Sequence, residues 1–184
     1  MIRSPLFYVG DKYKLVPQLL ELFPKQIDTY VEPFYGGGSS QLQVEASKYI
    51  LNDIDKNVIS LHKLLLSYAE NKVSFFESIF KMIDVYGLSC SFKEDVIPYT
   101  LKKEYPKTYY SKYNKYAYSR LKEDYNASEN KDALKLYLLL IYGFNHMIRF
   151  NSRGAFNLPV GNVDFNKNVY DALSTYFQLQ KGRD

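Results

Sequence analysis

The sequence has 184 residues, 46 % of them hydrophobic, with a formal net charge of +4 and a single cysteine. This length and composition predict one globular domain, or one domain with a small lobe, and exclude a scaffold built on disulfides. The single cysteine favours a reducing compartment, and no apolar run approaches the roughly 20 residues of a membrane span, so we expect a cytoplasmic protein with no membrane partner. The mildly basic charge permits a nucleic-acid partner without requiring one.

In chain order, residues 5–12 (PLFYVGDK) predict a short extended piece with a Gly-Asp turn. Apolar residues at helical spacing then predict a helix that Pro24 ends. Within the first segment, Tyr8 and Lys12 would by themselves indicate only half-buried packing and a solvated charge.

Residues 27–55 predict one β–loop–α–β unit. A short buried strand ends at Val31, and the loop 32–40 (EPFYGGGSS) contains three consecutive glycines. We expect an amphipathic helix next, and then a strand at 49–51 that ends in NDID. The apolar residues expected on the helix are Leu42, Val44 and Ala46.

The chemistry of this loop indicates a ligand that contains a nucleoside. Glycines let the backbone approach a ligand, and the N–H groups that open the helix would point at it. Asp53, at the tip of the second strand, can accept both hydroxyls of a ribose. A dinucleotide-dependent oxidoreductase is disfavoured, because its fingerprint needs a glycine where Gln41 stands and because Glu32 is unsuited to a pyrophosphate. S-adenosylmethionine, which is cationic, fits better; the alternative is a tight turn that needs glycine only for steric reasons.

Two amphipathic helices at 56–70 and 73–86 are expected to face the core, with His62 in a structural role. Residues 99–125 contain eight tyrosines and seven Lys or Arg residues but three acids. Basic residues mixed with tyrosines suit a phosphate backbone. A helical insertion with a solvated lysine face and a tyrosine core side is the alternative, and both interpretations can hold.

Asp132 begins an almost entirely apolar segment, 133–142, which predicts a buried helix that ends at Gly143. Residues 144–162 follow, with arginines, asparagines and turn-forming residues but no acid. They predict a β-hairpin or an irregular loop, and Arg and Asn can pair bidentately with guanine and adenine in the major groove. The alternative is an ordinary polar hairpin whose arginines bind local carbonyls.

Three blocks of this sequence, in this order, resemble the Dam-type (D12 class) DNA adenine-N6 methyltransferases. The first is FYVGDK at 7–12, which is similar to an aromatic-x-Gly-Gly-Lys motif with Asp11 in place of the second glycine. The second is EPFYGGGS at 32–39, followed by NDID at 52–55. The third, 145–161, is similar to the family's recognition hairpin, N-x-x-x-R-x-N-x-x-G-x-F-N-x-P-x-G.

The resemblance implies S-adenosylmethionine as cofactor, duplex DNA as partner and no metal. It implies that Arg149 reads a guanine. The implied cofactor-binding residues are Tyr8, Lys12, Glu32, Pro33, Phe34, Gly36, Gly38 and Asp53. The implied DNA-binding residues are Asn145, Met147, Arg149, Asn151, Arg153 and Pro159.

The family's catalytic motif, Asp/Asn-Pro-Pro-Tyr, is absent, because the sequence contains no Pro-Pro dipeptide. That motif accepts the protons of the adenine amino group and stacks on the flipped-out base, so no catalytic residue is assigned in this chain. The sequence ends at Asp184, near where the strand that leads to the motif is expected. We therefore expect an N-terminal portion of a methyltransferase, or one part of a split enzyme whose second polypeptide carries the motif. The alternative is a non-catalytic DNA-recognition and cofactor-binding subunit.

The expected fold is α/β, namely a Rossmann-like methyltransferase fold with an incomplete sheet and a mostly helical target-recognition region. Residues 1–70 would form the cofactor-binding half, and residues 71–165 the recognition region, with its hairpin at 145–161. Residues 166–184 would return toward the first half. An incomplete sheet should leave an open, partly uncovered edge.

Overall fold

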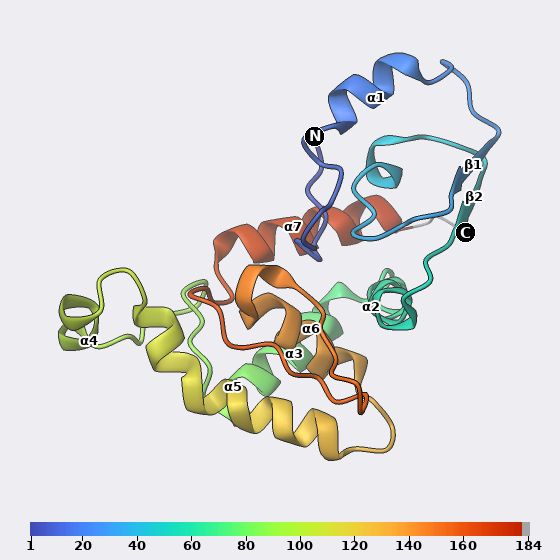
Figure 1. Ribbon diagram of the computed structural model, residues 1–184. Coiled ribbons are helices and arrows are strands. Elements are labelled where there is room, and N and C mark those ends of the chain that lie inside the picture. The colour runs from blue at the N-terminus through green and yellow to red at the C-terminus, as the bar shows by residue number, and fades with distance from the viewer. Residues whose placement is uncertain (182–184) are drawn as a thin grey trace.

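The computed structural model describes residues 1–181, so the last three residues of the predicted return segment 166–184 lie outside it. Within the described residues the chain is mixed α/β, with seven α-helices and two short strands. Figure 1 shows the small sheet on one side of the molecule and most of the helices on the other. The predicted α/β class is therefore confirmed.

The sheet consists of two parallel strands, β1 (Thr29–Glu32) and β2 (Lys48–Leu51). Val31 pairs with Ile50, so the two side chains share one face of the sheet, where they are 55 % and 46 % exposed. The prediction of a buried first strand is wrong for Val31, because the described residues do not fully cover this face. The open edge that the sequence predicts for an incomplete sheet stays a prediction.

The helix predicted directly after the glycine loop is wrong. One turn of 3-10 helix, Gln41–Gln43, forms there, and Val44 already has an extended backbone with φ −102° and ψ 132°. The Tyr49 hydroxyl accepts from the N–H of Ala46 (3.0 Å) and donates to the Val44 carbonyl (2.9 Å). These bonds hold the chain extended just before β2, so no further helical turn forms. One 3-10 turn therefore follows the glycine loop where an α-helix was predicted.

The first three helices are α1 (Val16–Leu22), α2 (Lys56–Ser67) and α3 (Lys72–Tyr86). Asp55 caps α2, because its carboxylate accepts from the N–H of Asn57 at 2.8 Å. Both predicted core-facing helices are confirmed, with small differences at their ends. Since α2 begins just after β2, it places its first turns close to the end of the sheet.

Four more helices follow, namely α4 (Tyr99–Glu104), α5 (Tyr109–Ala127), α6 (Ala133–Tyr142) and α7 (Lys167–Gln180). Asp132 caps α6 by accepting from two backbone N–H groups. The helix predicted at 133–142 is therefore confirmed. Among residues 1–181, no helix combines the length and the apolar character that crossing a membrane requires.

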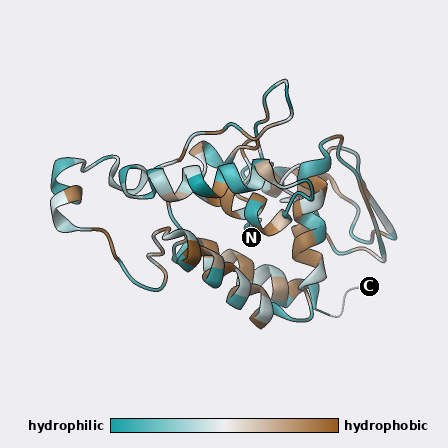
Figure 2. Cartoon of the chain, turned by 90° about the horizontal axis from the view of Figure 1, so that it is seen from below, coloured by the Kyte–Doolittle hydropathy of each residue, from teal (hydrophilic) through white to brown (hydrophobic). Residues whose placement is uncertain are grey.

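The core is centred on α6, in which every residue from Leu136 to Tyr142 is buried. The helix packs against α2 and α5, and one hydrophobic cluster joins residues from before 70, from 71–165 and from α7. Figure 2 shows that hydrophobic residues (brown) lie mainly on the helices, whereas the outer loops are mainly hydrophilic. The division at 70/71 and 165/166 stays a prediction.

Residues 143–162, the recognition segment, double back without forming a regular strand. Isolated antiparallel bridges join Phe150 to Phe156 and Gly143 to Val160. At the tip, the N–H of Asn151 donates to the carbonyl of Ala155 at 2.9 Å. The segment is thus closed by separate bridges, and a regular β-hairpin is unconfirmed.

Candidate functional site

A cavity of about 240 Å³ lies between the N-terminal loop and the glycine loop. The glycine loop follows β1 and Asp53 follows β2, so both lie at the carboxyl ends of parallel strands, where open α/β sheets bind ligands. Pro33 is not in the cavity wall, and its carbonyl accepts from the Asn52 side chain at 3.0 Å. The cavity does gather the other predicted cofactor residues, namely Tyr8, Lys12, Glu32, Phe34, Gly36, Gly38 and Asp53.

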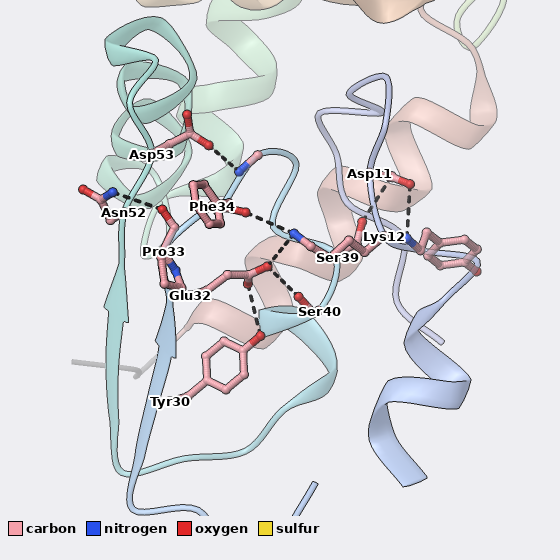
Figure 3. Close-up of polar contacts among 12 residues, drawn as sticks. Asp11, Lys12, Tyr30, Glu32, Pro33, Phe34, Ser39, Ser40, Asn52 and Asp53 are labelled. Atoms are coloured by element: carbon pink, nitrogen blue, oxygen red, sulfur yellow. Dashed lines mark hydrogen bonds and ion pairs between the residues drawn. The ribbon is translucent and has the colours of Figure 1, made fainter. Parts of the chain in front are cut away.

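Glu32 is a buried carboxylate at the base of this cavity, and Figure 3 shows the groups that surround it. Its two oxygens accept from Lys12 Nζ (3.1 Å), Ser40 Oγ (2.7 Å) and the Tyr30 hydroxyl (3.2 Å). Lys12 Nζ also donates to the Phe34 carbonyl at 3.0 Å. The buried charge is therefore paired and bonded, as a buried carboxylate must be. An ammonium has three N–H donors, so one donor of Lys12 remains for a ligand.

Asp53 is bonded to the glycine loop. Its Oδ2 accepts from the N–H of Gly36 at 2.8 Å, and its Oδ1 accepts from the N–H of Asp55 at 2.9 Å. Gly36 has φ +50°, a conformation that favours glycine. A Cβ on Gly37 would lie 3.3 Å from the Cβ of Tyr8, so glycine also allows the loop to pack closely against the N-terminal segment.

Asp11 joins the two loops that form the cavity, which the sequence did not indicate. Its Oδ2 accepts from Ser39 Oγ at 3.1 Å and lies 3.9 Å from Arg3 Nη2. Its Oδ1 accepts from the N–H of Tyr13 at 3.2 Å. The residue that departs from the family's second glycine therefore has a definite structural role here.

Two exposed apolar side chains lie beside the site. Phe34, in the cavity wall, is 79 % exposed, and Ile54, next to Asp53, is 95 % exposed. Asp53 also lines a second cavity of about 540 Å³ that extends toward Lys63. Burial raises the pKa of the Tyr8 phenol, and the charges of Asp55 and Asp53 raise it further, so this hydroxyl stays protonated as a donor. Sequence reasoning missed Ile54, although an isoleucine directly after the acid was visible.

His62, on α2, lies beneath the glycine loop. Its Nε2 is 2.8 Å from the Gly36 carbonyl oxygen, and its ring stacks on Tyr35 with centroids 4.1 Å apart. Burial lowers the pKa of His62 to about 4, although the bond to Gly36 and the charge of Asp53 oppose this. The imidazole is therefore neutral near pH 7, and its contacts place it beside the candidate site.

In the recognition segment, Arg149 is exposed and oriented by Asn157. Its Nε donates to the Asn157 side-chain oxygen (2.9 Å) and its Nη2 to the Asn157 carbonyl (2.8 Å). A guanidinium has five N–H donors, so three remain available to another partner. The arginine is thus held in one direction while it keeps donors for a ligand.

The other predicted DNA-binding residues lie on the same segment. The side-chain oxygen of Asn151 accepts from the N–H groups of Arg153 (2.9 Å) and Ala155 (3.0 Å), so it shapes the turn. Asn145, Arg153 and Pro159 are exposed, whereas Met147 packs against the core. All of these residues belong to the recognition segment, and their contact with DNA stays a prediction.

Two asparagine side chains fix the recognition segment to α5. The Asn126 amide accepts from the N–H of Phe156 (2.8 Å) and donates to its carbonyl (3.0 Å). Asn162 accepts from the N–H of Ser111 (3.2 Å) and donates to the Lys107 carbonyl (2.9 Å). One clamp lies near each end of the helix, so α5 is the scaffold of the segment. Sequence periodicity gave no signal for these long-range pairs.

Replacing Asn126 with alanine should lower the free energy of unfolding by about 1–3 kcal/mol, because both polar groups of the buried Phe156 would lose their partner. Urea unfolding measures this change. Asn130→Ala, at an exposed position, is the control and should change stability by less than about 0.5 kcal/mol. Equal stabilities of the two variants would contradict the clamp.

The recognition segment meets the cofactor cavity at the N-terminal loop. The N–H of Val9 donates to the His146 carbonyl at 3.4 Å, and the His146 and Phe7 rings lie 5.7 Å apart. Phe7, Asn145 and His146 all have positive φ, at 50°, 53° and 49°. Such backbone strain in non-glycine residues is concentrated at functional sites.

Among residues 1–181, no group of three His, Cys, Asp or Glu side chains is placed to hold a metal ion.

A glycine loop and an acid at the carboxyl ends of two parallel strands are in the place where open α/β sheets bind ligands. The family profile described as D12 class N6 adenine-specific DNA methyltransferase matches residues 8–179. The chain belongs to this family.

Relatives with established names agree with this assignment. The modification methylase StsI of Streptococcus sanguinis is 32 % identical over 177 residues, which is 95 % of this chain and 23 % of the relative. The type II methyltransferase M.FokI of Planomicrobium okeanokoites is 35 % identical over 161 residues, 87 % of this chain and 21 % of the relative. The DNA adenine methylase of Escherichia coli K12 is 27 % identical over 184 residues, 99 % of this chain and 55 % of the relative. The chain thus spans about half of the last relative and less than a quarter of the first two.

Proposed function

We propose that this chain binds S-adenosylmethionine in the glycine-loop cavity and duplex DNA through residues 143–162, as part of an enzyme that methylates adenine at N6. One observation carries the proposal. Side chains that are far apart in sequence line a single cavity, and the recognition segment lies against the loop that forms one of its walls. The family and the names of the relatives support this reaction.

The groups around the cavity suit this cofactor. Its ribose diol would donate to Asp53, whose carboxylate has lone pairs beyond the two used by Gly36 and Asp55. Its carboxylate would accept the remaining donor of Lys12, and the exposed Ile54 offers apolar surface for the purine. Since Asp53 lines both neighbouring cavities, a ligand larger than about 240 Å³ can extend past it. The bound cofactor would supply the methyl group, while the chain binds and orients it.

For the recognition segment, we propose that Arg149 reads a guanine and that Asn145, Met147, Asn151, Arg153 and Pro159 lie beside it at the DNA. The pairing with Asn157 supports this role for Arg149, because it fixes the guanidinium while leaving three donors. The cluster of lysines and tyrosines on α4 and α5 would contribute contacts to phosphates.

Arg149→Ala should weaken binding to the preferred duplex by about 1–3 kcal/mol and relax sequence preference, because a bidentate contact to guanine is lost. Selection from a random duplex pool first defines the preferred site, and fluorescence anisotropy then compares it with a scrambled duplex. Lys81→Ala, on the exposed side of α3, is the matched control and should leave the preference unchanged. A ratio of the two affinities that stays the same after Arg149→Ala would rule out base reading by this residue.

We also propose that the Asp-Pro-Pro-Tyr motif is supplied by residues outside these 184, either in a longer chain or on a second polypeptide. The lack of any Pro-Pro dipeptide supports this. In the alternative, the chain is a non-catalytic recognition and cofactor-binding subunit that needs a partner with the motif. Methyl transfer from radiolabelled cofactor, with and without a polypeptide that carries the motif, tests both, and robust transfer by the chain alone would contradict both. The regions 1–70, 71–165 and 166–184, and a cytoplasmic location, remain part of this proposal.

A further inference from the structure

Both polar backbone groups of Gly36 are held by side chains from other elements. The N–H donates to Asp53 Oδ2 at 2.8 Å, and the carbonyl oxygen lies 2.8 Å from Nε2 of His62. Asp53 follows β2 and His62 lies on α2, so the two partners come from separate parts of the fold. A residue bonded in this way cannot turn without breaking one of the two bonds.

The tautomer of His62 follows from its surroundings. A carbonyl oxygen only accepts hydrogen bonds, so Nε2 must carry the proton. Nδ1 is buried and has no hydrogen-bond partner among the described residues, which suits the unprotonated nitrogen of a neutral ring. The ring is held in place by stacking on Tyr35, with an interplanar angle of 30°. His62 is therefore a rigid donor aimed at Gly36.

We propose that His62 is a positioning residue of the cofactor site, which acts through Gly36 on the carboxylate of Asp53. This inference rests on the proposed function. Asp53 uses Oδ2 on the N–H of Gly36, so the direction of its remaining lone pairs depends on how that residue is oriented. If the bond to His62 is lost, Gly36 keeps only its bond to Asp53, and the carboxylate, although still bonded to the N–H of Asp55, is held less firmly in its orientation toward the cavity.

The test compares two variants that separate hydrogen bonding from packing. His62→Gln keeps an N–H donor near the position of Nε2, whereas His62→Phe keeps the ring, the stacking on Tyr35 and the buried volume. Calorimetry measures the dissociation constant for S-adenosylmethionine, and NMR measures amide hydrogen exchange at Gly36. We expect His62→Phe to weaken binding about tenfold and to speed exchange at Gly36, and His62→Gln to stay within about threefold of the wild type.

A merely structural role predicts the opposite order, because phenylalanine preserves the packing better than glutamine does. Binding by His62→Phe that equals the wild type, or by His62→Gln that is as weak as by His62→Phe, would overturn the inference. Equal exchange at Gly36 in all three proteins would do so independently of any ligand. Absence of cofactor binding in the wild type would instead overturn the proposed function, and with it the role of His62 in binding.

A measurement on the unsubstituted protein guards against variants that fail to fold. The nitrogen chemical shifts of His62 in a labelled sample report which ring nitrogen carries the proton. The inference requires a proton on Nε2 near pH 7. A proton on Nδ1 would overturn it, because Nε2 could then not donate to Gly36.

Discussion

Asp53→Ala should weaken the binding of S-adenosylmethionine by at least about 100-fold, because two hydrogen bonds to a charged group are lost and each contributes about 1.5–3 kcal/mol. The substitution removes the acceptor proposed for both ribose hydroxyls. It also removes the partner of the Gly36 N–H, so Gly36 keeps only the bond of its carbonyl to His62. Isothermal titration calorimetry of the wild type and the variant measures the change.

The matched control is Asp84→Ala, which removes a carboxylate from an exposed position on α3. It should change the dissociation constant by less than about twofold, since the ion pair of Asp84 with Lys93, at 3.5 Å, is exposed to solvent. Equal affinities of Asp53→Ala and Asp84→Ala, with both proteins folded, would show that Asp53 does not hold the cofactor.

The second large effect is a loss of stability in mild acid. Burial lowers the pKa of His62 from 6.5 to about 4 in the folded protein, so the unfolded chain binds this proton more readily. Stability is therefore unaffected by this group above pH 6.5, falls as the pH drops toward 4, and shows no further loss from it below 4. The whole shift corresponds to about 3 kcal/mol of unfolding free energy.

Other groups titrate in the same range, so the comparison with His62→Gln isolates this one. The pKa of His146 is also lowered by burial, but His146 is present in both proteins and its effect cancels. Urea unfolding between pH 7 and pH 4 should show the wild type losing about 3 kcal/mol more than the variant. A difference between the two proteins that stays constant over this range would contradict a buried, neutral His62.

The sequence predicted correctly those elements whose apolar spacing and capping residues indicate the same structure that their packing in the fold requires. The segment that forms α6 is apolar almost throughout and begins after a capping aspartate, so both its limits and its burial were readable. The helix predicted after the glycine loop failed because Leu42, Val44 and Ala46 satisfy an apolar pattern that an extended connection also satisfies. The side-chain bonds of Tyr49 decide between the two, and periodicity does not show them.

The candidate site was predictable as a set of residues, because the resemblance identified the motifs. The hydrogen bonds and ion pairs that connect these residues could not be predicted. The ion pair of Lys12 with Glu32, the bond of His62 to Gly36 and the clamp of Asn126 on Phe156 each join residues at least 20 positions apart. Such contacts depend on how the elements pack, and single-sequence patterns report only neighbours along the chain.

Binding of S-adenosylmethionine in the glycine-loop cavity is tested by a calorimetric titration of the wild-type chain. We expect saturable binding at one site, which S-adenosylhomocysteine displaces and NAD does not affect. Heat of binding with NAD but none with S-adenosylmethionine would contradict it, because the loop would then serve a dinucleotide. Failure to bind either ligand, with the protein folded, would show that the cavity of these 184 residues is not by itself the cofactor site.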